Sequence, residues 1–360
     1  MQCVTPMFRR YKLGEYSKGK VVPREEVALD LSQDPNTIRF CLNEMNNYTR
    51  KNGKGYMYEI IPCGHCYACR LNKSAEWATR CVLETQEHVH AYWLTLTYDE
   101  EHLPIYKYFT DGQGNYFEND GTWTGTLEPE DVNIFLNSLR KYFERKGITG
   151  IRYFYAGEYG SKPQELGGAR PHYHMLLWGA PLDMKQFYDF KPNPEFHYWS
   201  WHSKEIDHFW KKGFVLITQI EWSNAAYTAR YSMKKLEDLA QSPTIYAESG
   251  KLKEFVRMSR RPGIGMKYFY DNMKEIYKND EIIMKTVKGN TGSIKPPSAW
   301  DKKFKELYPT EYFMIKQQRK AAAERSRNNQ YFLSDYTDLD ILQHNMDKVN
   351  SKAAMLPREL

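Results

Sequence analysis

Apolar residues recur with the two-residue period of strands in some segments of the chain and with the 3.6-residue period of helices in others. Residues 91–98 (AYWLTLTY) are rich in aromatic and β-branched side chains, which predicts a core strand. The predicted elements in chain order are a helix over 74–87 with Ser74 as N-cap, a strand over 91–98, a helix over 130–146, strands over 151–158, 172–178 and 214–221, and a helix over 223–239 with Ser223 as N-cap.

The order of these elements predicts the fold class. Between the strands 151–158 and 172–178 lies a connection rich in Gly and Pro, which indicates an antiparallel hairpin. Helices and strands otherwise alternate irregularly, which is typical of an α+β fold with a central, mainly antiparallel sheet flanked by helices.

We expect three regions along the chain. Residues 1–73 form an N-terminal extension with a cysteine-rich element, and residues 74–240 form the core, with a tryptophan-rich insertion near 180–212. Residues 241–360 form a basic, helical C-terminal extension with a mobile tail.

The composition excludes several classes of protein. Apolar side chains make up 41% of the 360 residues and charged ones 27%, the balance of a folded globular chain rather than a disordered one. No apolar run approaches the roughly 18 residues of a membrane span, and residues 1–12 lack the core of a signal peptide. We therefore expect a cytoplasmic protein without a membrane partner.

A histidine pair is the strongest candidate for chemistry. His172 and His174 are two residues apart in a predicted strand, so both imidazoles project from one face. The hairpin brings Glu158 alongside as a third, oxygen ligand. Two nitrogens and a carboxylate suit Mn²⁺ or Mg²⁺ and leave positions open for a phosphate oxygen. Alone, the two histidines would be ordinary half-buried strand residues.

A second motif lies on the predicted helix 223–239. Tyr227 and Tyr231 are four residues apart and share a helical face, and Arg230 and Lys234 each follow a tyrosine by three residues. A phenol is a poor nucleophile at neutral pH unless its phenolate is stabilised, which nearby cations can do. The alternative is that both tyrosines are core aromatics.

Cysteines cluster near the N-terminus. Cys63, Cys66 and Cys69 form C-x-x-C-x-x-C, and Cys3, Cys41 or His65 would complete a four-ligand structural Zn²⁺ site. An iron–sulfur cluster and three reduced thiols are the alternatives.

Basic residues suggest contacts with nucleic acid. Residues 251–267 combine cations with aromatic neighbours, which suits a groove for single-stranded DNA. A solvated face is the alternative. The candidate DNA-binding residues are Lys235, Arg257, Arg260, Arg261 and Lys267.

Three motifs in this order resemble those of the HUH endonucleases that initiate rolling-circle replication. They are Leu94-Thr95-Leu96-Thr97-Tyr98, His172-Tyr173-His174 and Tyr227-x-x-x-Tyr231. The chain is most similar to the replication initiation proteins of small single-stranded DNA phages, the microvirus group and its gokushovirus-like branch. Further matches are Pro62-Cys63-Gly64-His65-Cys66-x-x-Cys69-Arg70, Gly157-Glu158-Tyr159-Gly160 and Arg261-Pro262-Gly263-Ile264-Gly265.

The resemblance implies an HUH endonuclease fold and a mechanism. A metal held by the histidines polarises an origin phosphate, and a tyrosine attacks it to leave a 5′-phosphotyrosine and a 3′-OH that primes synthesis. The second tyrosine cuts the regenerated origin, and the ends are joined into a circle. The resemblance also implies origin DNA, a host helicase and the host replication machinery as partners, in the cytoplasm of the bacterial host.

Two other functions fit parts of the sequence. A non-catalytic, zinc-containing nucleic-acid-binding protein would need only the cysteines and the basic residues. A two-histidine-one-carboxylate iron oxygenase would use Glu158, His172 and His174. The tyrosine pair and the basic loop argue against the oxygenase, which needs neither.

Overall fold

The computed structural model describes residues 3, 6–12, 19–30, 56–105, 108–110, 115–118, 125–160, 170–193, 198–229, 252–285, 291–332 and 335–354. The chain divides into two compact units. Residues 1–73 and 301–358 form the first unit, and residues 74–300 with 359–360 form the second.

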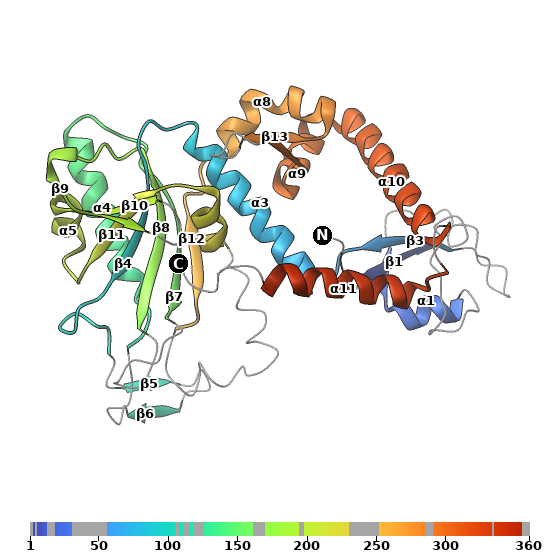
Figure 1. Ribbon diagram of the computed structural model, residues 1–360, viewed down its shortest axis with the longest axis horizontal. Coiled ribbons are helices and arrows are strands. Elements are labelled where there is room, and N and C mark those ends of the chain that lie inside the picture. The colour runs from blue at the N-terminus through green and yellow to red at the C-terminus, as the bar shows by residue number, and fades with distance from the viewer. Residues whose placement is uncertain are drawn as a thin grey trace. The chain divides into compact units, whose positions relative to one another are not determined.

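A seven-stranded sheet is the centre of the second unit (Figure 1). All of its neighbouring strands pair antiparallel, and β7 and β8 form the predicted hairpin. The order across the sheet is β12 (Phe255–Met258), β7 (Arg152–Tyr159), β8 (Pro171–Trp178), β4 (Ala91–Thr97), β11 (Val215–Gln219), β10 (Tyr198–Ser203) and β9 (Phe187–Asn193). The predicted α+β fold with a central antiparallel sheet is confirmed.

One face of this sheet packs against α4 (Pro129–Arg145) and α5 (Lys204–Trp210). Pro129 occupies the first turn of α4, where its missing N–H costs nothing, and the Glu128 side chain caps the helix by accepting the N–H of Glu130. The apolar stripe of α4 then lies against alternate residues of the strands. The buried residues of α4 on this side include Val132, Phe135, Leu136, Leu139 and Phe143.

The opposite face packs against the C-terminal part of α3 (Tyr67–Thr85) and the helical residues 222–229. The predicted N-cap at Ser74 is wrong: α3 begins at Tyr67, and the buried Ser74 hydroxyl donates instead to the Ala226 carbonyl at 3.3 Å. Ser223 is not an N-cap either, since it lies inside the second helix. There the Asn224 side chain accepts the Glu221 N–H at 2.8 Å, which satisfies a free donor at the helix start.

The tryptophan-rich segment extends the sheet at one edge. It forms the 3₁₀ turn Met184–Gln186, strands β9 and β10, and α5. Trp201 and Trp210 are buried in the core on the α4 side, and the Trp210 indole donates to the Thr97 carbonyl at 2.7 Å. The segment therefore belongs to the sheet and to its core.

The remaining elements of the second unit are short or follow the sheet. Two hairpins, β5–β6 and β13–β14, stand apart from the main sheet in their pairing. These elements are β5 (Tyr108–Thr110), β6 (Tyr116–Glu118), α8 (Met266–Asn279), β13 (Ile282–Lys285) and β14 (Thr291–Ile294).

The first unit has a small sheet of its own, in the order β2–β1–β3, and Phe8 and Tyr58 are buried on it. Residues 338–354, expected as a mobile tail, form a helix that Thr337 and Asp340 cap reciprocally. The elements assigned to this unit are β1 (Met7–Lys12), β2 (Lys20–Val22), α1 (Arg24–Asp30), β3 (Tyr56–Ile61), most of α9 (Ser298–Leu307), α10 (Pro309–Phe332) and α11 (Asp338–Ala354).

Within the described ranges, no helix combines the length and the apolar character that crossing a membrane requires.

Candidate metal and tyrosine site

Strand register brings the predicted metal ligands together. In the β7–β8 hairpin Glu158 lies opposite His172, and the neighbouring pair on the same face places Ala156 opposite His174. Because side chains alternate along a strand, Glu158 and both histidines project from the sheet face that also carries residues 222–229. The hairpin predicted from the sequence is thus what assembles the three groups.

Both imidazoles point at one carboxylate oxygen. The Nε2 atoms of His172 and His174 lie 2.8 Å and 2.7 Å from Oε1 of Glu158, and one ligand atom from each of the three residues lies within 4.8 Å of the others. His172 donates through Nδ1 to the Arg170 carbonyl at 3.1 Å, which leaves its Nε2 as the metal-binding nitrogen. The arrangement is that of a three-ligand metal site.

Thr95 and Trp93 hold His174 in place. Oγ1 of Thr95 is 3.0 Å from Nδ1 of His174, and the Trp93 ring stacks on the imidazole with centroids 4.8 Å apart. The sequence placed both residues on a core strand without assigning them to the site. Their alternation with buried residues on 91–98 was the signal, because Thr95 neighbours His174 in the register of β4 and β8.

The donor set fits a divalent cation. Glu158 is only 1% exposed, and its second oxygen, Oε2, is buried without a hydrogen-bond partner in the described structure. A buried anionic oxygen without a partner is costly, and a cation bound there would remove that cost. Two imidazole nitrogens and a carboxylate are ligands of Mn²⁺ and related metals.

The charges of the three groups are coupled. Burial alone would raise the pKa of the Glu158 carboxyl, but the imidazoles, above all His174, lower it to about 2. Burial alone would lower the pKa of His172, but its hydrogen bond to Glu158 raises it. The carboxylate is therefore ionised at neutral pH and competes with no proton for a metal.

Tyr227 reaches the same cluster from the helix that covers this face of the sheet. Its side chain is 5% exposed, its hydroxyl lies 3.5 Å from Oε1 of Glu158, and its ring meets the His174 ring edge-on at 5.2 Å. The helix is anchored where the Trp93 indole donates to Thr228 Oγ1 at 2.9 Å. Of the other residues predicted on this helix, Arg230, Tyr231, Lys234 and Lys235 lie outside the described residues.

Tyr98, the last residue of the first motif, lies on the opposite side of the sheet. Its hydroxyl donates to Oδ2 of Asp131 at 2.9 Å and lies 3.1 Å from the Tyr173 hydroxyl. Burial raises the pKa of Tyr98, which keeps the phenol neutral. Tyr98 thus fixes β4 and β8 to α4 from behind the site.

Four cysteine sulfurs meet in the first unit. Sγ of Cys3 lies 3.5 Å from Sγ of Cys63 and 3.6 Å from that of Cys66, and the four-sulfur group includes Cys69. Backbone N–H groups of His65 and Cys66 donate to the Cys63 sulfur at 3.4 Å and 3.2 Å. Cys41, an alternative fourth ligand, lies outside the described residues. This donor set is the Cys₄ set of structural zinc sites.

The predicted DNA-binding residues are divided between exposed and paired positions. Arg260 and Arg261 are exposed on the loop after β12, and Arg257 of β12 lies over the Phe255 ring at 5.2 Å. Lys267, on the first turn of α8, is instead paired with Glu87 and Asp271.

Comparisons with known proteins agree on one family. The model of the ORF2 family of replication-associated proteins matches residues 91–236. The chain is 36% identical to replication-associated protein ORF2 of Spiroplasma virus 4 over 84% of this chain and 86% of that protein. It is 25% identical to replication-associated protein VP4 of Bdellovibrio phage phiMH2K, over 77% and 79% of the two chains. It is 24% identical to replication-associated protein ORF4 of Chlamydia phage 1, over 62% and 49%. No solved structure matches.

The coupling of Glu158 and His172 predicts a pH effect in metal-free protein. Because the carboxylate raises the pKa of His172, the imidazole should titrate above the ordinary histidine value of about 6.5. Protonated His172 should then stabilise the fold fully below pH ~6.5, and this contribution should be lost as the pH rises through the folded-state pKa. Glu158→Gln removes the charge and leaves the burial, so the pKa of His172 should fall.

An NMR titration of the imidazole resonances, in wild-type protein and Glu158→Gln, measures the difference. His208 on α5 lies outside the cluster and is the internal control. Equal midpoints for His172 in the two proteins would contradict the coupling.

Proposed function

Since this chain belongs to the replication-associated proteins of small single-stranded DNA phages, the microvirus type, we propose that it initiates rolling-circle replication by nicking the origin strand with a tyrosine. The observation that carries this proposal is the meeting of a nearly buried phenol, two imidazoles and a carboxylate at one point of the sheet. Oxygenases and purely structural metal sites do not require such a phenol.

The proposed reaction is a transesterification. The Tyr227 oxygen forms a bond to the phosphorus, the bond from phosphorus to the 3′ oxygen breaks, and that oxygen takes up a proton. The products are a 5′-phosphotyrosine and a free 3′-OH. No energy cofactor is needed, because the phosphotyrosine ester conserves the energy for rejoining.

His172, His174 and Glu158 would hold the divalent cation, Mn²⁺ or Mg²⁺. When bound, such a cation supplies a Lewis acid that polarises a phosphate oxygen. The protein's own contribution is orientation: Thr95 and the Arg170 carbonyl fix the two imidazoles, and the helix of residues 222–229 aims the phenol at them.

Tyr231 is proposed as the second nucleophile. It follows Tyr227 by four residues, so in a continued helix it shares the same face. Arg230 and Lys234 would stabilise the phenolates. Alternation of the two phenols would let one protein cut the regenerated origin and join the released ends into a circle.

Other parts of the chain would serve DNA binding. We propose that Lys235, Arg257, Arg260, Arg261 and Lys267 contact backbone phosphates, and that Cys3, Cys63, Cys66 and Cys69 bind a structural Zn²⁺. We expect the protein to act in the cytoplasm of the bacterial host, together with a host helicase and the replication machinery.

Removing the phenolic oxygens tests the nucleophiles. Phenylalanine keeps the ring packing, so each of Tyr227→Phe and Tyr231→Phe should lose multi-round replication, and the double variant should form no covalent protein–DNA adduct. Tyr270→Phe, which changes an exposed tyrosine on α8, is the matched control and should form the adduct normally. Peptide mapping of the adduct identifies the linked residue, and DNA found on any other tyrosine would refute the assignment.

Perturbing the ligands tests the metal. His172→Ala and His174→Ala should abolish cleavage of supercoiled origin DNA and leave non-specific DNA binding in place. Thr95→Val removes the hydroxyl that orients His174 and should weaken Mn²⁺ binding by about 10- to 100-fold. Thr97→Val is the control, since the Thr97 hydroxyl donates to the Phe214 carbonyl instead of to a ligand. Full cleavage by a double histidine variant would rule out this metal site.

Metal analysis tests the cysteine cluster. Protein purified without added metal should contain about one Zn²⁺ per chain, which Cys63→Ser should lose together with thermal stability. Cys81→Ser is the control, because Cys81 is buried in a separate core and is not among the four clustered sulfurs. A zinc-free wild-type protein, or one containing iron, would reject the structural zinc. Zinc without any nicking would favour the non-catalytic nucleic-acid-binding protein.

A further inference from the structure

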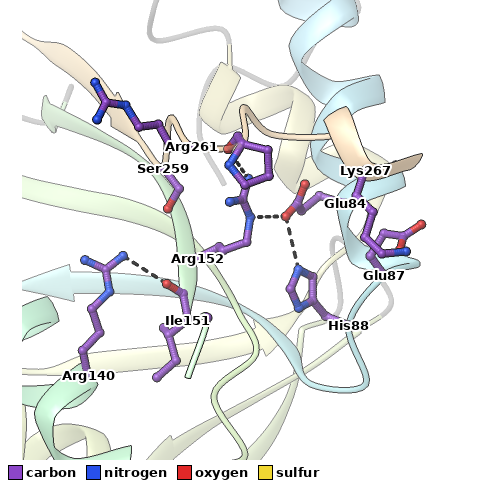
Figure 2. A pocket seen from close by; sticks show the side chains of 11 residues that line it. Glu84, Glu87, His88, Arg140, Ile151, Arg152, Ser259, Arg261 and Lys267 are labelled. Atoms are coloured by element: carbon purple, nitrogen blue, oxygen red, sulfur yellow. Dashed lines mark hydrogen bonds and ion pairs between the residues drawn. The ribbon is translucent and has the colours of Figure 1, made fainter. Parts of the chain in front are cut away.

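A second site of unusual charge lies on the second unit, at the opposite end of β7 from Glu158 (Figure 2). It is a cavity of about 320 Å³, at the lower end of the volumes of small-ligand sites. Four cationic side chains and two carboxylates line it, which leaves an excess of 4 − 2 = 2 positive charges. The cationic side chains are Arg140, Arg152, Arg261 and Lys267.

The two carboxylates are already neutralised. Glu84, whose side chain is 4% exposed, pairs with Nε of Arg152 and accepts from the Gly265 N–H at 2.6 Å, and His88 approaches it at 3.2 Å. Burial alone would raise the pKa of Glu84, but these partners lower it, so the group stays ionised. Glu87 pairs with Lys267. The excess charge therefore belongs to the other two arginines.

Arg140 and Arg261 retain unused donors. Arg140 is half-buried, spends one N–H on the Ile151 carbonyl at 3.0 Å, and lies over the Tyr153 ring at 5.1 Å. Within the described part of the chain, no carboxylate pairs with either arginine. A half-buried guanidinium without a counter-ion, at the wall of a cavity, is a group that an anion would stabilise.

Ser259 completes the donor set. Its oxygen accepts the Tyr153 N–H at 3.1 Å, which leaves the hydroxyl hydrogen free to donate. In the view of Figure 2, Arg140, Ser259 and Arg261 lie on one side of the cavity and the Glu84–Arg152–His88 network on the other. Planar guanidinium groups with a hydroxyl between them match the geometry of a phosphate.

We propose that this cavity binds a phosphate group carried by a nucleotide, through Arg140, Arg261 and Ser259. Arg152 and Glu158 share a strand and are six residues apart, which separates this site from the metal ligands by about 20 Å. The phosphate bound here is therefore not the one being cleaved. It comes either from the backbone of a DNA strand or from a free nucleotide, and the site does not depend on the cleavage chemistry.

Binding measurements without added divalent cation test the proposal. The probes are a fluorescein-labelled dT20 oligonucleotide, followed by anisotropy, and thymidine 5′-monophosphate, followed by calorimetry. Arg140→Gln with Arg261→Gln should weaken binding of at least one probe by tenfold or more. Arg145→Gln, an exposed charge on the same helix that does not line the cavity, is the control. The single variant Arg261→Gln alters an exposed side chain and guards against misfolding of the double variant.

The two probes distinguish the sources. If DNA backbone occupies the site, the dependence of dT20 affinity on salt should lose about 0.7 in log–log slope for the phosphate contact removed. If a free nucleotide occupies it, only thymidine monophosphate binding should be lost. Both results support a phosphate site. Equal affinities of the double variant and Arg145→Gln for both probes would overturn it. Whether wild-type protein nicks DNA is measured separately, so failure of the proposed function leaves this result intact.

Discussion

The Glu158 carboxylate, buried between two imidazoles, is the constraint around which the second unit is arranged. An isolated buried anion would be costly, and here the two histidines and the approaching Tyr227 hydroxyl surround Oε1. This requires β7 and β8 to pair in one register, because a slip of one residue would turn the histidines to the other face. Tyr98 and Tyr173, bonded to each other and to α4 behind the sheet, hold that register.

The same face must also be covered without closing the site. Trp93 serves both purposes, since its ring stacks on His174 and its indole N–H bonds Thr228 on the covering helix. The helix therefore takes its position from the strand that orients the metal ligand. Catalytic geometry and core packing share the same side chains, so substitutions in this core would displace the phenol as well as destabilise the fold.

Much of the fold and half of the candidate site were predictable from sequence, for local reasons. The strand alternation of 172–178 and the turn-rich connection before it determine which side chains face together, and the structure shows Glu158, His172 and His174 in contact. Helix starts were less predictable: Ser74 and Ser223 look like caps, but one is a buried tertiary donor and the other lies inside its helix. Tertiary contacts outweighed local capping preference there. Thr95 and the pairing of Arg140 with Arg261 depend on long-range register and packing, which single-sequence patterns do not encode.

The small sheet of the first unit has a consequence for chain length. β1 pairs with β3 along its full length, and Cys3 meets Cys63 across 60 residues, so the chain between them is a loop closed at one end. The entropy of closing such a loop grows only logarithmically, by about 0.6 kcal/mol for each doubling of its length. Insertions or deletions between α1 and β3 are therefore thermodynamically inexpensive. This part of the chain is free to differ in length between relatives while the four sulfurs keep their arrangement.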